Sequence, residues 1–254
     1  MSLNTDYDIT HMPSYRFSDE VKSLMIPVAS IEILGREGPL GADYLVAQKI
    51  VPLVAERTCI HYTPTVPFGD TQQLPTGGGT VHIPSEILSQ YYGSIARSYK
   101  NHSSIRHLFF FTFHSLNLFA VDLSARDLSE KQFRISSIDW WKCVSSVAGN
   151  LLDDKKYGTG HGGEMIMSVM SYLFPEYIDI HNRGDRRLKE GFDYYVSHLP
   201  RSASAVQTYG DFSDYCEDSC WGSLDGVSEE KGKLLVERAV ETISEQIVTA
   251  LQVL

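Results

Sequence analysis

The hydrophobic positions of the chain form short unbroken runs separated by longer periodic segments. Residues 107–113 (H-L-F-F-F-T-F) are the most hydrophobic run, and residues 24–28 form a second one. An unbroken apolar run is buried on both faces, so these segments predict strands of a parallel sheet, with 107–113 in the centre. Residues 59–66 and 133–138 predict shorter strands, and Pro64 favours a place towards the sheet edge for the first of these.

Between the strands, apolar residues recur three and four positions apart, as they do on one face of a helix. This spacing predicts helices over residues 42–57, 84–100, 117–128, 164–174 and 227–254, and a short helix near 18–24. Residues 176–226 show little periodicity, and we expect them at a pocket rim or in subunit contacts. Strands that alternate with helices, without a repeat or a linker, predict a single α/β domain over residues 1–254 with a mainly parallel sheet.

Composition and charge narrow the possible function classes. The formal net charge is −10 at pH 7, whereas sequence-independent nucleic-acid binding requires a basic face. No apolar run approaches the roughly 20 residues of a membrane span, and the polar N-terminal residues do not resemble a signal peptide. The 4 cysteines are scattered, which favours reduced thiols. We therefore expect a cytoplasmic protein that binds neither nucleic acid nor membranes.

Acidic residues stand where the first predicted strand would end. Glu32 follows residues 24–28, a glycine-rich loop comes next, and Asp43 opens the following helix. Ligands of open α/β sheets gather where strand ends meet loops and helix N-termini, so the two acids are candidate oxygen ligands for a divalent metal. Acids beside glycines are also ordinary turn formers and helix caps. The pattern alone leaves both interpretations open.

Histidines occupy two further positions of interest. His114 directly follows the most hydrophobic strand, either as a satisfied core histidine or as a group at the same sheet edge as Glu32 and Asp43. His161 lies in a glycine-flanked loop (G-T-G-H-G-G), either as a plain loop residue or as an acid/base, since imidazole titrates near neutrality. Glu164 begins the next helix, where the helix dipole alone would favour an acid.

Other conspicuous residues have plain structural alternatives. Asn117 also fits a helix cap, and Trp140 and Trp141 also fit core or interface positions. The glycines at 77–79 lack the lysine and the spacing of a phosphate-binding P-loop, which excludes a nucleotide site of that type.

Taken in order, these segments resemble the creatininase (creatinine amidohydrolase) family from residue 25 to residue 247. The family's opening motif G-S-x-E-Q-H-G-P-H-L-P-L-G-T-D corresponds to A-S-I-E-I-L-G-R-E-G-P-L-G-A-D at residues 29–43. Its strand-end histidine and the following asparagine are similar to F-H-S-L-N at 113–117, and its H-G-G-x-x-E-T-S segment is similar to residues 161–168. Further similar positions are Gly79-Thr80, Trp140-Trp141, Pro175 and Glu230-Lys231-Gly232.

The resemblance implies a three-layer α/β/α fold, usually assembled as a hexamer, and a two-metal site that hydrolyses C–N bonds. Position by position, Glu32, Asp43 and His114 resemble the ligands of one metal, for which Zn²⁺ is expected, with Mn²⁺ or Fe²⁺ as alternatives. His161 corresponds to the catalytic histidine that delivers a proton to the leaving nitrogen. Further candidates are Glu164 for catalysis and Thr80, Asn117, Trp140 and Trp141 for substrate binding.

The match to the family breaks at the second metal. Three of its ligand-type positions are aliphatic here: Leu34, Leu116 and Ile166. We therefore expect one ion per chain. Glu164 is two positions from one lost acid and is a candidate to compensate for it, and Arg36 or Glu37 are candidates to fill the vacated space.

The resemblance therefore implies a metal-dependent amidohydrolase that acts on an amide, lactam or formamide of a small molecule, in a homo-oligomer. The alternative is a catalytically degenerate family member that binds a metabolite or serves as an oligomeric scaffold, because two-metal chemistry often uses both ions.

Overall fold

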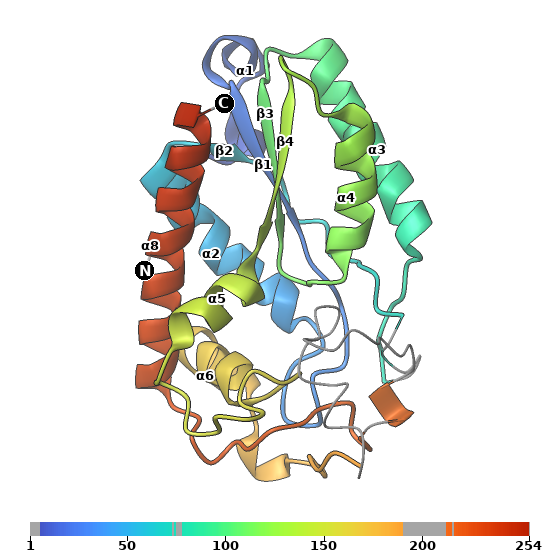
Figure 1. Cartoon of the computed structure of the whole chain (residues 1–254). Helices are drawn as coiled ribbons and strands as arrows, with labels where there is room; N and C mark the ends of the chain where they lie inside the picture. Colours follow the sequence, from blue (N-terminus) through green and yellow to red (C-terminus); the bar gives the residue numbers. More distant parts are fainter. Residues whose placement is uncertain (1–5, 73, 75–77, 190–211, 215, 254) are drawn as a thin grey trace.

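The computed structural model describes residues 6–72, 74, 78–189, 212–214 and 216–253, so part of the aperiodic segment 176–226 and of the loop around Pro75 lies outside the described residues. The elements in chain order are α1 (Ser14–Glu20), β1 (Ser23–Val28), α2 (Ala42–Thr58), β2 (His61–Tyr62), α3 (Ser85–His102), β3 (His107–Thr112), α4 (Asn117–Leu128), β4 (Arg134–Asp139), α5 (Trp140–Ala148), α6 (Glu164–Leu173) and α8 (Glu229–Val253) (Figure 1). Short 3₁₀ turns lie at Ile9–His11, Pro175–Tyr177, Ile180–Asn182 and Phe212–Asp214.

The four strands form one parallel sheet in the order β2-β1-β3-β4. The two unbroken hydrophobic runs, β1 and β3, are the central pair, in register from Ser23 opposite His107 to Val28 opposite Thr112. Because all strands run the same way, their carboxyl ends meet at one edge of the sheet.

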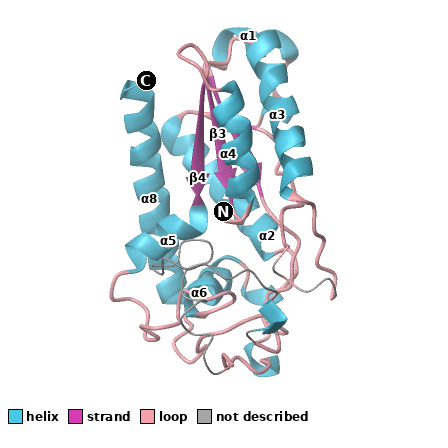
Figure 2. Ribbon diagram, turned by 45° about the vertical axis from the view of Figure 1, so that its right-hand side comes forward, coloured by secondary structure: helices cyan, strands magenta, loops and turns pink. Residues whose placement is uncertain are grey.

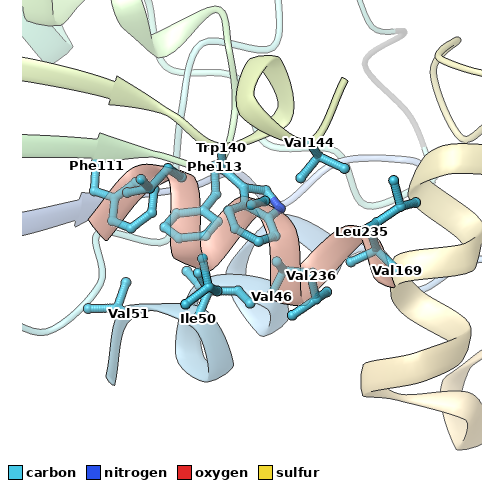
Figure 3. Packing of buried hydrophobic residues seen from close by; sticks show 14 of the residues in the cluster. Val46, Ile50, Val51, Phe111, Phe113, Trp140, Val144, Val169, Leu235 and Val236 are labelled. Carbon is cyan, nitrogen blue, oxygen red and sulfur yellow. The ribbon is translucent and has the colours of Figure 1, made fainter. Parts of the chain in front are cut away.

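Helices cover both faces of the sheet. Successive strand residues point to opposite faces, so Phe109 and Phe111 pack with α2, α5, α6 and α8, whereas Leu108 and Phe110 pack with α3 and α4. Figures 1 and 2 show α3 and α4 on one side of the strands and α8 on the other. In Figure 3, Phe111, Phe113 and Trp140 lie against side chains of α2 and α8. The expected three-layer α/β/α arrangement with a parallel sheet is confirmed.

The last helix, α8, has 25 residues and buries one stripe that includes Leu235, Ala239, Ile243 and Ile247. Charged residues separate these positions along the helix. None of the described helices combines the length and the apolar character needed to cross a membrane.

Three elements differ from the sequence prediction. The first helix, α1, spans Ser14–Glu20 and so begins and ends earlier than the helix predicted near residues 18–24. It ends earlier because the chain is already extended at Ser23, where β1 begins. The edge strand β2 is only two residues long; Pro64 has no N–H to donate, and Val66 makes only an isolated bridge to β1. Helix α5 was not predicted, although the carboxylate of Asp139 accepts a hydrogen bond from the first turn and caps it.

Candidate metal centre

The carboxyl ends of β1 and β3 bring two acids and one imidazole together. Glu32 lies in the loop after β1, Asp43 in the first turn of α2, and His114 just beyond β3. One ligand atom from each of the three residues lies within 4.8 Å of the other two, and all three residues are buried. His114 Nδ1 is 2.9 Å from Glu32 Oε2 and 3.4 Å from Asp43 Oδ2. The parallel sheet thus makes neighbours of residues that are far apart in sequence.

Backbone hydrogen bonds hold the loop that carries Glu32. The Glu32 N–H donates to the carbonyl of Leu40 at 2.8 Å, and the Ile33 N–H donates to the hydroxyl of Thr80 at 3.0 Å. Gly35 has φ +73°, and a Cβ there would lie 2.8 Å from the carboxylate of Glu37. Thr80, expected to bind substrate, therefore has its hydroxyl engaged in shaping this loop.

The orientation of His114 is set by a carbonyl on its far side. His114 Nε2 lies 2.6 Å from the carbonyl oxygen of Asp70, which can only accept, so Nε2 carries a proton and Nδ1 faces the acids. Asn117 is fully buried; its side chain accepts from the Asp70 N–H and donates to the carbonyl of Ala29, both at 3.0 Å. Asn117, another expected substrate-binding residue, therefore ties the Asp70 loop to the end of β1.

Two side chains fix the carboxylate of Asp43. The hydroxyl of Ser30 donates to Oδ2 at 2.8 Å, and the indole N–H of Trp141 donates to Oδ1 at 2.8 Å. The neighbouring Trp140 is fully buried, with its ring centroid 5.9 Å from that of Phe113. Trp141 therefore contacts one of the three candidate ligands, whereas Trp140 occupies the core position that the sequence left open as an alternative.

Changing Trp141 to phenylalanine removes the N–H donor but keeps an aromatic ring. Loss of such an outer hydrogen bond typically weakens metal binding about 10- to 100-fold, and we expect a loss of zinc affinity in this range. Competition with a chromophoric chelator measures it. Trp140→Phe is the matched control, since within the described residues the Trp140 indole nitrogen makes no hydrogen bond. Equal zinc affinities of the two variants would contradict this role of Trp141.

The buried charges of the centre shift one another's pKa values. Burial opposes ionisation of Glu32, but His114 and, to a lesser extent, His161 outweigh burial and hold the pKa of Glu32 well below its usual range. Burial and the Glu32 charge raise the pKa of Asp43. Burial disfavours the imidazolium of His114, yet the two acids raise its pKa well above its ordinary value. The acids thus create a position that strongly attracts positive charge.

The donor set fits a divalent ion. Glu32 Oε2 is buried, and its contact within the described residues is the ion pair with His114 Nδ1 at 2.9 Å, which lacks hydrogen-bond geometry. A buried carboxylate is costly unless a cation neutralises it, and either protonated His114 or a metal ion would supply that charge. Two carboxylates and an imidazole are suitable ligands for Zn²⁺, Mn²⁺ or Fe²⁺ and leave coordination positions open.

His161 approaches this centre from the opposite loop. Its Nε2 is 3.1 Å from Glu32 Oε1, and its Nδ1 is 2.8 Å from the carbonyl oxygen of Ser219. The carbonyl can only accept, so Nδ1 carries a proton and Nε2 faces Glu32. Burial lowers the pKa of His161, but the Cys220 thiol, 3.7 Å away, and Glu32 raise it well above its ordinary value. His161 Nε2 therefore lies beside the carboxylate of Glu32, which is one of the three candidate metal ligands.

Aliphatic side chains occupy the second-metal positions of the family motif. Leu34 and Ile166 are buried in the same hydrophobic cluster, and Leu116 is half-buried. Of the two residues expected to fill the space, Arg36 is exposed, whereas Glu37 is buried.

Glu164 contacts other residues than those of the candidate metal centre. Its carboxylate is fully buried, accepts from the Asp153 and Asp154 N–H groups at 2.9 and 2.8 Å, and forms an ion pair with Lys231 of α8. These contacts favour a structural role that joins α6 to α8, in place of the catalytic role inferred from its position.

Sequence reasoning missed Asp70 and Ser219, which orient the two histidines through their backbone carbonyls. A carbonyl contact leaves no signal in the residue type. Ser219 has φ +58°, which is uncommon for a residue other than glycine and is likewise invisible in the sequence.

Comparisons with known proteins agree with this fold. The sequence model of the family described as Creatininase, creatinine amidohydrolase, matches residues 11–247. A crystal structure of creatinine amidohydrolase (creatininase) has a TM-score of 0.77 at 21% identity, covering 97% of this chain and 98% of that chain. A putative creatinine amidohydrolase from Bacteroides fragilis NCTC 9343 has a TM-score of 0.76 at 19% identity, covering 96% of each chain.

A mutant creatininase of Zn–Zn type is also similar, with a TM-score of 0.75 at 21% identity, covering 96% of this chain and 98% of that chain. No curated protein sequence matches. At these identities the structures show a shared fold, and the family model covers most of the chain. The protein belongs to the creatininase family.

Proposed function

We propose that this protein is a metal-dependent amidohydrolase that cleaves the C–N bond of a small-molecule amide, lactam or formamide. The convergence of three buried residues, Glu32, Asp43 and His114, whose ligand atoms lie within 4.8 Å of one another, carries the proposal. Membership of the creatininase family supports it. Zn²⁺ is the favoured ion, given the mixed nitrogen and oxygen ligands and the Zn–Zn relative, with Mn²⁺ or Fe²⁺ as alternatives.

Glu32, Asp43 and His114 hold the ion in this proposal. A divalent ion supplies Lewis-acid polarisation of the amide carbonyl and acidifies a water molecule. His161 carries its mobile proton on Nε2. Its Nδ1 keeps its own proton, because that N–H donates to the carbonyl of Ser219. As the C–N bond breaks, His161 donates the Nε2 proton to the departing nitrogen, and it recovers a proton from the water that adds to the carbonyl carbon. The products are an amine and a carboxylic acid.

One ion per chain is expected instead of two. Leu34, Leu116 and Ile166 offer no ligand atom where the family motif has ligand-type residues. Elemental analysis of protein dialysed against zinc and then freed of excess metal should give about one equivalent per chain. Two tightly bound equivalents would contradict the one-ion proposal.

Activity is tested with purified protein supplied with Zn²⁺ or Mn²⁺. Creatinine, small lactams and formamides form the substrate panel, and release of the amine or opening of the ring is followed. Hydrolysis that requires the metal supports the proposal, and no hydrolysis of any member contradicts it.

The aliphatic second site favours one alternative, a family member that has lost catalysis and binds a metabolite or serves as a scaffold. This alternative predicts retention of the fold and of oligomerisation without turnover. Under either function we propose that the protein forms a homo-oligomer, and the family resemblance implies a hexamer. The molecular mass in solution tests this proposal.

A further inference from the structure

A buried guanidinium lies beside the candidate centre. The side chain of Arg186 is 9% exposed and forms an ion pair with Glu37, whose side chain is 1% exposed. The other hydrogen bonds of Arg186 within the described residues go to backbone: Nε donates to the carbonyl of Gly222 at 2.9 Å, and Nη2 donates to the carbonyl of Gly162. One planar group therefore bonds to three separate segments of the chain.

Each of these three segments contributes to the placement of His161. Gly162 is the residue directly after His161. Gly222 belongs to the loop in which the Ser219 carbonyl accepts from His161 Nδ1. Glu37 lies in the loop that carries Glu32, whose Oε1 faces His161 Nε2 at 3.1 Å. Arg186 thus links the segment that bears the imidazole to both segments that contact its nitrogens.

The packing around this guanidinium is tight. Gly162 has φ +64°, and a Cβ there would lie 2.7 Å from Cys220 Sγ and 3.5 Å from Arg186 Nη2. On the other side, the carboxylate of Glu37 folds back against Gly35. Side chains at either glycine would displace the ion pair or its neighbours.

Stability alone does not account for this arrangement. Burying two charges costs solvation energy, and apolar side chains of similar volume often stabilise a protein as well or better. What an apolar pair lacks is direction, since guanidinium presents its donors in a fixed plane and meets several acceptors at set angles. The three acceptors of Arg186 use this directionality.

We propose that Arg186, held by Glu37, is a positioning residue that fixes His161 relative to Glu32 for proton transfer. This inference rests on the proposed function of the site. Arg186 acts through the Gly162 and Gly222 carbonyls and through Glu37, and it contacts none of the reacting atoms. Its removal displaces the imidazole while the ligands Glu32, Asp43 and His114 remain.

The test compares Arg186→Met and Arg186→Lys with Arg187→Met. Arg187 is the matched control because its side chain is 87% exposed and is paired with Asp185. With the amide hydrolysed best by the unaltered protein, Arg186→Met should lower kcat about 100-fold, as expected for a small misplacement of a catalytic group, at unchanged KM and zinc content. Arg186→Lys should recover little of this loss, because a single ammonium group does not span three acceptors. Arg187→Met should match the unaltered protein.

A second readout does not depend on turnover. Nitrogen-15 spectra of labelled histidines, with His161 assigned by its absence from a His161→Ala sample, report which ring nitrogen is protonated and hydrogen-bonded. The unaltered protein and Arg187→Met should show one His161 species, with both ring nitrogens protonated and Nδ1 hydrogen-bonded, and both Arg186 variants should lose this single species. If Arg186→Met does not fold, Arg186→Lys decides the question alone.

Unchanged kcat in Arg186→Met, or full recovery by lysine, would overturn the positioning role. If the unaltered protein hydrolyses no amide of the panel, the proposed function fails, and the His161 spectra still decide whether Arg186 holds the imidazole. An unchanged His161 spectrum in both Arg186 variants overturns the inference in that case too.

Discussion

Replacing His161 by alanine is expected to leave bound zinc in place and to lower kcat for amide hydrolysis by about 10²- to 10⁴-fold, the range for loss of a general acid/base. His161 is not one of the three candidate ligands, but its side chain reaches them: Nε2 lies 3.1 Å from Glu32 Oε1. Without it, the departing nitrogen leaves unprotonated or takes its proton from water. Zinc content by elemental analysis and steady-state kinetics on the same sample measure the two effects.

The control for this substitution is His102→Ala, which removes an exposed histidine at the end of α3. Its kcat should equal that of the unaltered protein. Zinc loss in His161→Ala would instead indicate that His161 is a ligand, and full activity would exclude it as the proton donor.

The parallel sheet was predictable because its two central strands are the most hydrophobic short runs of the chain. Residues 107–113 include an unbroken apolar run from Leu108 to Phe111, and a run this short and this apolar favours a strand covered on both faces. Once the sheet is parallel, the ends of β1 and β3 share an edge, and Glu32 and His114 must lie near one another. The structure places them together, and their roles as ligands stay a prediction that the substitutions here test.

Local sequence did not indicate the parts of the site that depend on tertiary contacts. Trp141 was open as a core, interface or substrate-binding residue, and only the approach of α5 to α2 shows that its N–H donates to Asp43. Ser219 and Arg186 come from the aperiodic segment, where neither strand nor helix periodicity predicts a position. Ser219 acts through its own backbone carbonyl, and Arg186 donates to the carbonyls of Gly162 and Gly222, groups that every residue possesses.

For Glu164, the sequence suggested a role in the site that the contacts of its side chain do not favour. The family alignment places it close to a metal-ligand position, and an acid at a helix start fits several roles. In the structure its carboxylate accepts two backbone N–H groups and pairs with Lys231, so its charge is already compensated within the described part of the chain. A shift of two positions along a helix turns a side chain by about 200° at 3.6 residues per turn, which is enough to direct it elsewhere.

Replacing His114 by alanine is expected to abolish zinc retention. The substitution removes the nitrogen ligand of the three-residue cluster and leaves two buried carboxylates, and it removes a histidine that holds the pKa of Glu32 below its usual range. Breaking a buried ion pair costs about 3–5 kcal/mol, so the variant should also unfold at a lower temperature. Elemental analysis after dialysis and thermal unfolding with and without zinc measure both effects.

The thermal shift separates loss of the ligand from general damage. A ligand that binds only the folded state stabilises it, so zinc should raise the Tm of the unaltered protein and leave that of His114→Ala unchanged. His107→Ala is the matched control, because His107 is buried at the other end of the same strand, where burial lowers its pKa to about 4. That variant should lose stability but keep the zinc-induced shift. Zinc must displace the proton from His114 Nδ1, so the zinc-induced rise in Tm of the unaltered protein should also shrink as the pH is lowered. A zinc-induced rise in Tm that persists in His114→Ala would show that the ion binds elsewhere.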